Sequence, residues 1–364
     1  MELNKYTWGA LSLAFALLIF IPACKKGESS GNNTPIENLK GTRIVLSEEY
    51  KGGIPLFIRE GHLMSKGAED DYIYTWSAVR NDSIIPENNI LRTGNGPDEV
   101  FTSHSGITYS GKGRMLAVSQ KNGSMFSVDE FIKEGDHFDI VNLSNKDDRM
   151  QDINWYFRSF ILENDSTILA IMAPYDNPDH FFARYDFKNN EYHKINWFFD
   201  DENNKEPSAK FSAYASNSSL LTNNKGKYLY VSGNERNAFI FTINGDKVNI
   251  ESKIYETPLK YKLAPDGLNY ACHHTGYDLT ATVDDNHIYL LSIDKDGTGI
   301  HNESPLKNLY GNKLEVFDWN GNLERTLMLD HLGYSIMVNP ADSSFYQFGI
   351  DSETGDYTVW KYKL

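Results

Sequence analysis

Basic residues are scarce relative to acidic ones in this chain of 364 residues. The sequence has 35 lysines and arginines against 50 aspartates and glutamates, which gives a formal net charge of −15 at pH 7. Proteins that bind nucleic acid, or that hold anionic membranes through basic patches, need the opposite excess. We therefore expect no nucleic-acid partner, and we interpret the short clusters of acidic residues as solvated loops.

Long hydrophobic runs are also missing, apart from one near the N-terminus. Residues 10–21 are nearly all apolar, but a helix needs about 20 such residues to span the hydrocarbon of a bilayer. The run has the length of the hydrophobic region of a secretory signal. It ends in Ile21–Cys24, and residues 25–33 are polar, whereas a membrane-spanning anchor would continue and would have a more basic flank.

This N-terminal region resembles a bacterial lipoprotein signal peptide, in which a small residue precedes the cysteine that becomes the lipidated N-terminus. The resemblance implies cleavage after Ala23 and acyl chains on Cys24. Several acyl chains anchor a protein stably, because each buried CH₂ contributes about 0.8 kcal/mol. We predict a signal peptide at 1–23, the lipidated cysteine and a flexible tether at 24–40, and a folded domain at 41–364. An ordinary cleaved signal with a stray cysteine is the alternative.

Cysteine is nearly absent, because Cys272 is the only one besides Cys24. If Cys24 is lipidated, no intrachain disulfide is possible. The thiol of Cys272, beside His273 and His274, is a candidate nucleophile. Adjacent residues of a strand point to opposite faces, however, so neighbours in sequence do not make a catalytic pair. A buried and inert cysteine is the simpler interpretation.

Sustained helical periodicity is rare after residue 40. Short apolar and aromatic runs of strand length recur instead, separated by Asn-Gly and Asp-Gly pairs that are typical of tight hairpins. The runs repeat about every fifty residues, which matches a propeller blade of four strands. We predict an all-β fold, a six-bladed β-propeller of four-stranded antiparallel blades. The strand at Arg43–Leu46 is expected to pair with the terminal strand at Tyr357–Lys363, because closure protects sheet edges.

The segment Gly94–Glu99 has the sequence Gly-Asn-Gly-Pro-Asp-Glu. Together with the lipidation signal and the repeat, it resembles the TolB-like six-bladed β-propeller lipoproteins of Gram-negative bacteria, over nearly the whole mature chain. The resemblance implies the propeller fold and an outer-membrane lipoprotein on the periplasmic or cell-surface face, without a general activity. The glycines and Pro97 suit a rigid crossover between blades, and a binding loop that includes Glu99 is the alternative.

Catalytic and metal-binding motifs are absent from the sequence. It contains no His-Glu-x-x-His and no Gly-x-Ser-x-Gly, and the calcium-loop-like segment Asp294–Gly299 has Pro305 where such a loop needs a bidentate glutamate. We therefore expect no metal and no cofactor. The candidate ligand residues are polar and aromatic side chains, most of them expected around the mouth of the propeller channel: Arg92, Glu99, His104, Arg158, Tyr214, His273, His274 and Tyr277.

These features predict a lipid-anchored, extracytoplasmic propeller that acts as a non-catalytic binding or assembly module in the cell envelope. We expect a monomer that reaches the membrane through its N-terminal lipid and binds an envelope protein, a glycan or a peptide. The alternative is a glycan-acting hydrolase or lyase with its active site at the channel mouth. Glycoside hydrolysis needs two carboxylates across a pocket, and a propeller can gather them from separate blades.

Overall fold

The computed structural model divides the chain into two units, Met1–Asn33 and Thr34–Leu364. All residues that the structure describes lie in the second unit. They are residues 35–69, 71–94, 99–100, 106–109, 114–118, 123–127, 139–141, 153–154, 159–174, 178–189, 191–201, 207–233, 236–257, 259, 261–263, 270–272, 279–292, 310–351 and 353–364. The signal, Cys24 and most of the predicted tether are outside these ranges.

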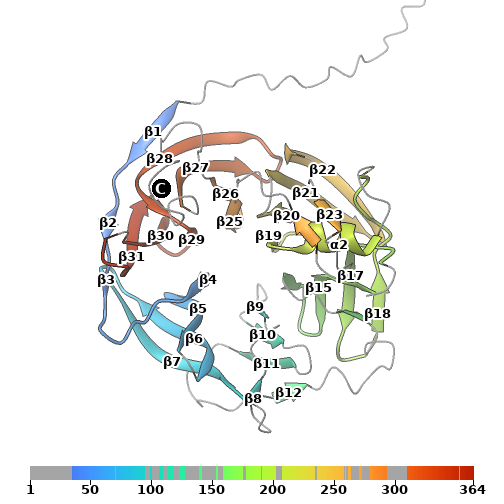
Figure 1. The fold of residues 1–364 in the computed structure, drawn as a ribbon, viewed down its shortest axis with the longest axis horizontal. Helices are drawn as coiled ribbons and strands as arrows, with labels where there is room; N and C mark the ends of the chain where they lie inside the picture. Colours follow the sequence, from blue (N-terminus) through green and yellow to red (C-terminus); the bar gives the residue numbers. More distant parts are fainter. Residues whose placement is uncertain are drawn as a thin grey trace, which may run out of the picture. The chain divides into compact units, whose positions relative to one another are not determined.

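Small antiparallel sheets in a propeller-like arrangement make up the second unit (Figure 1). The described residues contain a single helix, α2 (Pro207–Ala215). Nowhere in the described ranges is a helix long and apolar enough to cross a membrane. The all-β prediction is therefore confirmed.

Five sheets are each built mainly from four antiparallel strands of one continuous stretch of chain. In the order innermost to outermost, these strands are β4 (Ile54–Arg59), β5 (His62–Glu69), β6 (Tyr72–Val79) and β7 (Ser83–Thr93); β9 (Gly106–Tyr109), β10 (Arg114–Val118), β11 (Gly123–Ser127) and β12 (Asp139–Val141); β14 (Phe160–Leu162), β15 (Thr167–Ile171), β17 (Phe182–Asp186) and β18 (Glu191–Lys194); β19 (Ser218–Thr222), β20 (Tyr228–Ser232), β21 (Asn237–Asn244) and β22 (Lys247–Glu256); β25 (Leu279–Val283), β26 (His287–Ser292), β27 (Gly311–Asp318) and β28 (Leu323–Gly333).

The expected number of such blades was six, and this number is wrong for the described residues. The C-terminal stretch supplies only β29 (Ser335–Asn339), β30 (Ser344–Ile350) and β31 (Tyr357–Lys363), so its sheet takes a fourth strand, β2 (Thr42–Arg43), from the other end of the domain. Three further pairings are short. They are β13 (Ile153–Asn154) with β16 (Ala173–Pro174), β23 (Tyr261–Leu263) with β24 (Tyr270–Cys272), and β8 (Glu99–Val100) with β7.

Residues 36–46 form an N-terminal strap across the outer edges of three sheets. Strand β1 (Ile36–Leu39) pairs in parallel with β28, β2 pairs antiparallel with β31, and β3 (Val45–Leu46) pairs in parallel with β7. The predicted pairing with the C-terminal strand is thus confirmed at Arg43, which lies opposite Trp360. Residues 36–39 were expected in the tether and instead form a strand of the folded unit.

Hydrophobic cores lie between neighbouring sheets. Strand β20 is buried along its whole length, because both faces of its sheet are covered, and such strands read as continuous apolar runs. Between the third and fourth sheets, Phe182 stacks on Phe241 with ring centroids 4.9 Å apart. In the sheet of β29–β31, Phe345 stacks on Tyr362 at 5.0 Å, and both belong to the core shared with β26–β28.

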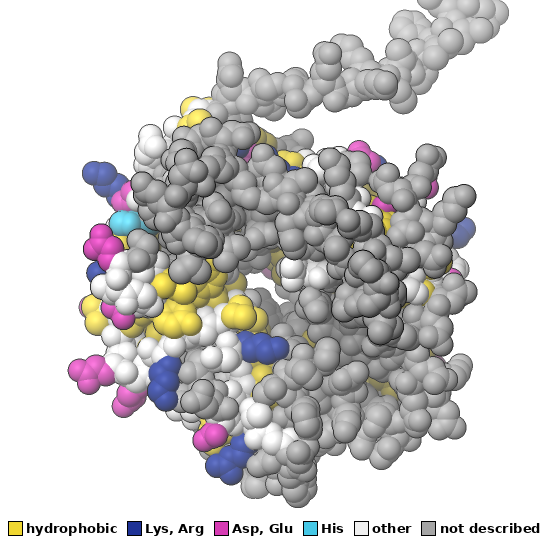
Figure 2. Space-filling model, viewed as in Figure 1, with side chains coloured by type: hydrophobic (Ala, Val, Ile, Leu, Met, Phe, Trp, Pro, Cys, Tyr) yellow, Lys and Arg dark blue, Asp and Glu magenta, His cyan; other side chains and the backbone are white. Residues whose placement is uncertain are grey.

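Hydrophobic side chains also gather on one face, over the sheets that contain β4 and β31 (Figure 2). Ile54 and Tyr357, at the starts of these two strands, are among the exposed large hydrophobic residues. Gly52 has φ +89° and a Cβ there would lie 2.1 Å from the ring of Tyr357. Only glycine therefore permits this close approach of the chain to the tyrosine.

Candidate binding pocket

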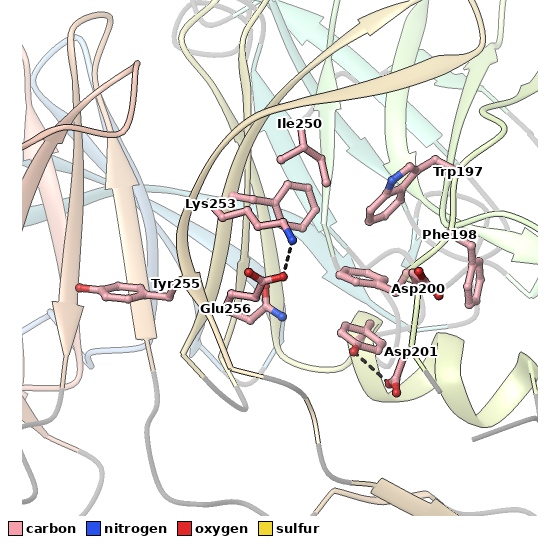
Figure 3. Close-up of a pocket in the computed structure, with 12 residues that line it drawn as sticks. Trp197, Phe198, Asp200, Asp201, Ile250, Lys253, Tyr255 and Glu256 are labelled. Carbon is pink, nitrogen blue, oxygen red and sulfur yellow. Dashed lines mark hydrogen bonds and ion pairs between the residues drawn. The ribbon is translucent and has the colours of Figure 1, made fainter. Parts of the chain in front are cut away.

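A pocket of about 350 Å³ lies between strands β21 and β22 and the segment that leads from β18 into α2 (Figure 3). Its floor is aromatic and aliphatic, and its rim carries charged side chains. The floor residues are Trp197, Phe198, Phe199, Tyr214, Phe239 and Ile250, and the charged rim residues are Asp200, Asp201, Lys253 and Glu256.

The aromatic floor is held together by ring contacts. Phe199 stacks on Tyr214 with centroids 3.7 Å apart and an interplanar angle of 15°, and it meets Trp197 edge to face at 4.7 Å. Trp197 stacks on Phe182 of β17 at 5.5 Å. Such pairs contribute about 0.5–1.5 kcal/mol each beyond the area they bury. The floor is therefore fixed before any ligand arrives.

Helix α2 begins at Pro207, a residue that suits the first helical position because its missing N–H would be unpaired there anyway. Its buried side chains include Phe211 and Tyr214. The hydroxyl of Tyr214 donates to Oδ2 of Asp201 at 3.0 Å. Burial and then the charge of Asp201 raise the pKa of Tyr214, so the phenol stays neutral and keeps the carboxylate at the pocket edge.

The rim has three carboxylates and one ammonium group. The ammonium of Lys253 is paired with Glu256 of the same strand, as the dashed line in Figure 3 marks. Asp200 is exposed, and no described residue pairs with its carboxylate. The rim therefore carries an excess of negative charge, and Asp200 is available to a cationic ligand.

Tyr255 lines the pocket from β22 and ties it to the next sheet. Its hydroxyl donates to Oε2 of Glu315 on β27, and the guanidinium of Arg236 donates to the same oxygen at 3.1 Å. The guanidinium carbon also lies 4.1 Å from the centroid of the Tyr255 ring. Burial raises the pKa of Tyr255. These contacts hold the β22 wall of the pocket against the sheet of β25–β28.

The predicted site residues are not gathered at one channel mouth. Tyr214 lines the pocket, but from helix α2 and not from the start of an innermost strand. Arg92 lies in β7 opposite Glu99 of β8, at the side of the first sheet away from β4, because the fourth strand of a blade is its outer one. The channel-mouth prediction is therefore wrong for Arg92 and Glu99. The guanidinium of Arg92 lies 5.8 Å from the ring centroid of Tyr72.

The remaining predicted residues lie outside the described ranges, and their role stays a prediction: Cys24, His104, Arg158, His273, His274 and Tyr277. Cys272 ends strand β24. Within the described part of the chain, no cluster of three or more histidines, cysteines, aspartates or glutamates is placed to hold a metal ion.

The sequence interpretation missed the run Trp197–Asp201. It placed the acidic residues 200–202 in a solvated loop and did not connect them with the three aromatic residues directly before them. The signal that was present is the abrupt change from Trp-Phe-Phe to Asp-Asp. Three exposed aromatic side chains in a row would be costly in a simple solvated loop, so the run indicates a packed floor that ends at an acidic rim.

No family model and no curated protein matches this chain. Among solved structures, it is similar to a structural genomics protein of unknown function from Bacteroides thetaiotaomicron VPI-5482, at 10% identity and a TM-score of 0.44, over 89% of this chain and 75% of that one. It is also similar to the extracellular domain of the BT4673 two-component system from B. thetaiotaomicron, at 11% identity and a TM-score of 0.39, over 84% of this chain and 32% of that one.

A third similar structure is YCF48 bound to D1 peptide, at 10% identity and a TM-score of 0.43, over 91% of this chain and all of that one (100%). The chain thus spans about a third of the BT4673 domain and most of the other two proteins. These similarities are distant, and we take no functional argument from them.

Proposed function

We propose that this chain is a lipid-anchored, extracytoplasmic module that binds a basic, partly apolar segment of an envelope protein in the pocket between β22 and α2. The observation that carries the proposal is the aromatic floor beside a rim of three carboxylates. In this role the chain holds a partner and does not transform it.

Lysine and arginine side chains fit such a surface, because each has an apolar stem and a charged head. The stem packs on the floor near Trp197 and Phe199, and the head reaches the free carboxylate of Asp200. Aromatic faces also attract cations directly. The net charge of −15 adds long-range attraction for a basic partner.

The placement in the envelope rests on the N-terminal sequence. The segment that ends at Cys24 supports lipidation, and the polar residues between Cys24 and strand β1 support a tether. The assignment to the TolB-like lipoproteins belongs to the same proposal and is supported by the lipidation signal, the propeller-like fold and the segment Gly94–Glu99.

Two labelled pentapeptides test the proposal on the full chain in phospholipid nanodiscs. Both have a Trp-Leu-Leu core, flanked by lysine in one peptide and by glutamate in the other. Fluorescence anisotropy should show binding of the lysine peptide only. Asp200→Asn should weaken this binding about fivefold, because one exposed charge contact contributes up to about 1 kcal/mol.

Asp165→Asn is the matched control, because Asp165 is an exposed aspartate in the turn before β15. It should leave binding of the lysine peptide unchanged. Equal binding of the two peptides, or equal effects of the two substitutions, would contradict the proposed function. Release of reducing sugars from envelope glycans by the chain would support the hydrolase alternative instead.

A further inference from the structure

A second cavity, of about 300 Å³, lies where the inner strands of five sheets approach one another. Its wall includes residues of β4, β9, β14, β19 and β25. Strand β9 contacts β14, β14 contacts β19, and β19 contacts β25. The cavity is therefore an inner space of the propeller-like unit, separate from the pocket beside α2.

The wall of this cavity is apolar with a few polar groups. Phe57, Ile107, Phe160 and Leu220 are among its apolar residues, and Lys66 on β5 is the one charged residue in the described lining. An apolar cavity of this size with a small number of polar groups is the usual form of a small-molecule site.

Two hydroxyl groups of the wall are oriented by the backbone. The N–H of Leu220 donates to Oγ of Ser159 at 2.5 Å, and the N–H of Val338 donates to Oγ1 of Thr282 at 3.4 Å. Each hydroxyl accepts in these bonds and keeps its own O–H to donate. Lys66 adds an ammonium donor to the same wall, so the polar groups of the cavity suit an acceptor that carries negative charge.

Lys66 is half-buried, and this burial lowers the pKa of its ammonium group. The lowered pKa reflects the cost of holding a positive charge away from water. An anionic group within the cavity offsets this cost by Coulomb attraction, which is stronger there than in water. A cationic ligand would add to it.

We propose that this cavity binds a small organic carboxylate with an apolar body. The carboxylate is held by Lys66 and by the hydroxyls of Ser159 and Thr282, and the apolar body packs against Phe57, Phe160 and Leu220. The site is independent of the pocket beside α2, and the two pockets favour ligands of opposite charge.

Three probes of matched shape test the inference by equilibrium dialysis with the full chain in nanodiscs, with empty nanodiscs as reference. They are 2-naphthoate, 2-naphthylmethanol and 2-naphthylmethylamine. The naphthoate should bind at one site per chain, and the amine should bind at least about tenfold more weakly, because a charged hydrogen-bonded contact carries that much affinity. Equal binding of the acid and the amine by the unaltered chain would overturn the inference.

Substitutions then assign the site to the lysine. Lys66→Met should lower naphthoate affinity about tenfold, to that of the neutral alcohol, and Lys66→Arg should retain it. Lys247→Met, at an exposed lysine of β22, is the matched control and should change nothing. If Lys66→Met bound naphthoate like the unaltered chain, the carboxylate would not be held by Lys66. The three probes decide the sign of the charge on the unaltered chain even if the methionine variant fails to fold.

Discussion

At the scale of single residues, the most completely buried titratable cluster centres on His180, which is 1% exposed. Its Nδ1 lies 2.5 Å from Oδ1 of Asp179, and its Nε2 lies 2.5 Å from the hydroxyl of Tyr192. The ammonium of Lys194 lies 2.7 Å from the second oxygen of Asp179. Burial lowers the pKa of His180 from its ordinary value of 6.5, although Asp179 opposes the shift. The ring is therefore held neutral by its surroundings.

This cluster predicts a pH-dependent loss of stability. Because the pKa of His180 is lower in the folded chain than in the unfolded chain, the unfolded state takes up the proton first as the pH falls below about 6.5. The free energy of unfolding should therefore fall between pH 7.5 and pH 5.5. His180→Gln should be less stable at pH 7.5 and should lose less on acidification. Urea unfolding at both pH values measures this difference, and parallel losses in the two proteins would contradict it.

At the scale of secondary-structure elements, the N-terminal strap (residues 36–46) connects sheets that the rest of the chain forms separately. Both nitrogens of the Arg325 fork donate to Glu37, at 3.0 and 2.8 Å. The N–H of Gly41 donates to Oδ1 of Asp330 at 3.0 Å, and the hydroxyl of Tyr362 donates to the same atom at 3.0 Å. The strap is thus bound by side chains between its short strand pairings.

The close packing of the strap predicts the effect of a single methyl group. A Cβ at Gly41 would lie 2.8 Å from Cζ of Tyr362, and this ring is buried against Phe345 and cannot move away freely. Gly41→Ala should therefore lower the free energy of unfolding by about 1–3 kcal/mol. Lys40→Ala, at the exposed neighbouring position, should change it by no more than about 0.5 kcal/mol. Equal urea midpoints for both variants would argue against this packing.

Short strands and their hairpins were predictable from sequence, because alternation and turn residues act over a few positions. The pairing of Arg43 with the C-terminal strand was also predictable from the need to protect sheet edges. Strand β1 was not, since its parallel partner β28 lies almost 300 residues further along the chain and residues 36–39 follow a polar segment. Tyr214 was identified as a candidate, but its place was not, because only the packing of α2 brings it to Phe199.

At the scale of the whole molecule, the two predicted features that bear on function are the N-terminal lipid and the acidic charge. The chain has two cysteines, and only Cys24 follows an apolar run. A membrane anchor at that position would hold the folded unit close to a surface while the tether permits it to rotate. Membrane attachment is then a property of one side chain and is separable from folding.

Cys24→Ser should therefore move the chain from the membrane fraction to the soluble fraction, because serine cannot form the thioether that carries the lipid. Cell fractionation followed by an alkaline carbonate wash measures the partition. Cys272→Ser is the matched control and should stay with the membranes. Membrane association of Cys24→Ser at the level of the unaltered chain would count against lipidation.

The N-terminal strap also defines how the folded unit would respond to mechanical force. Tension on the chain from its N-terminal side is applied first to β1, whose hydrogen bonds run to β28. If these yield, the load passes to Thr42–Arg43 on β31 and then to Val45–Leu46 on β7. Three different sheets therefore bear the pull in succession, and extension should be resisted in steps before any sheet is torn apart.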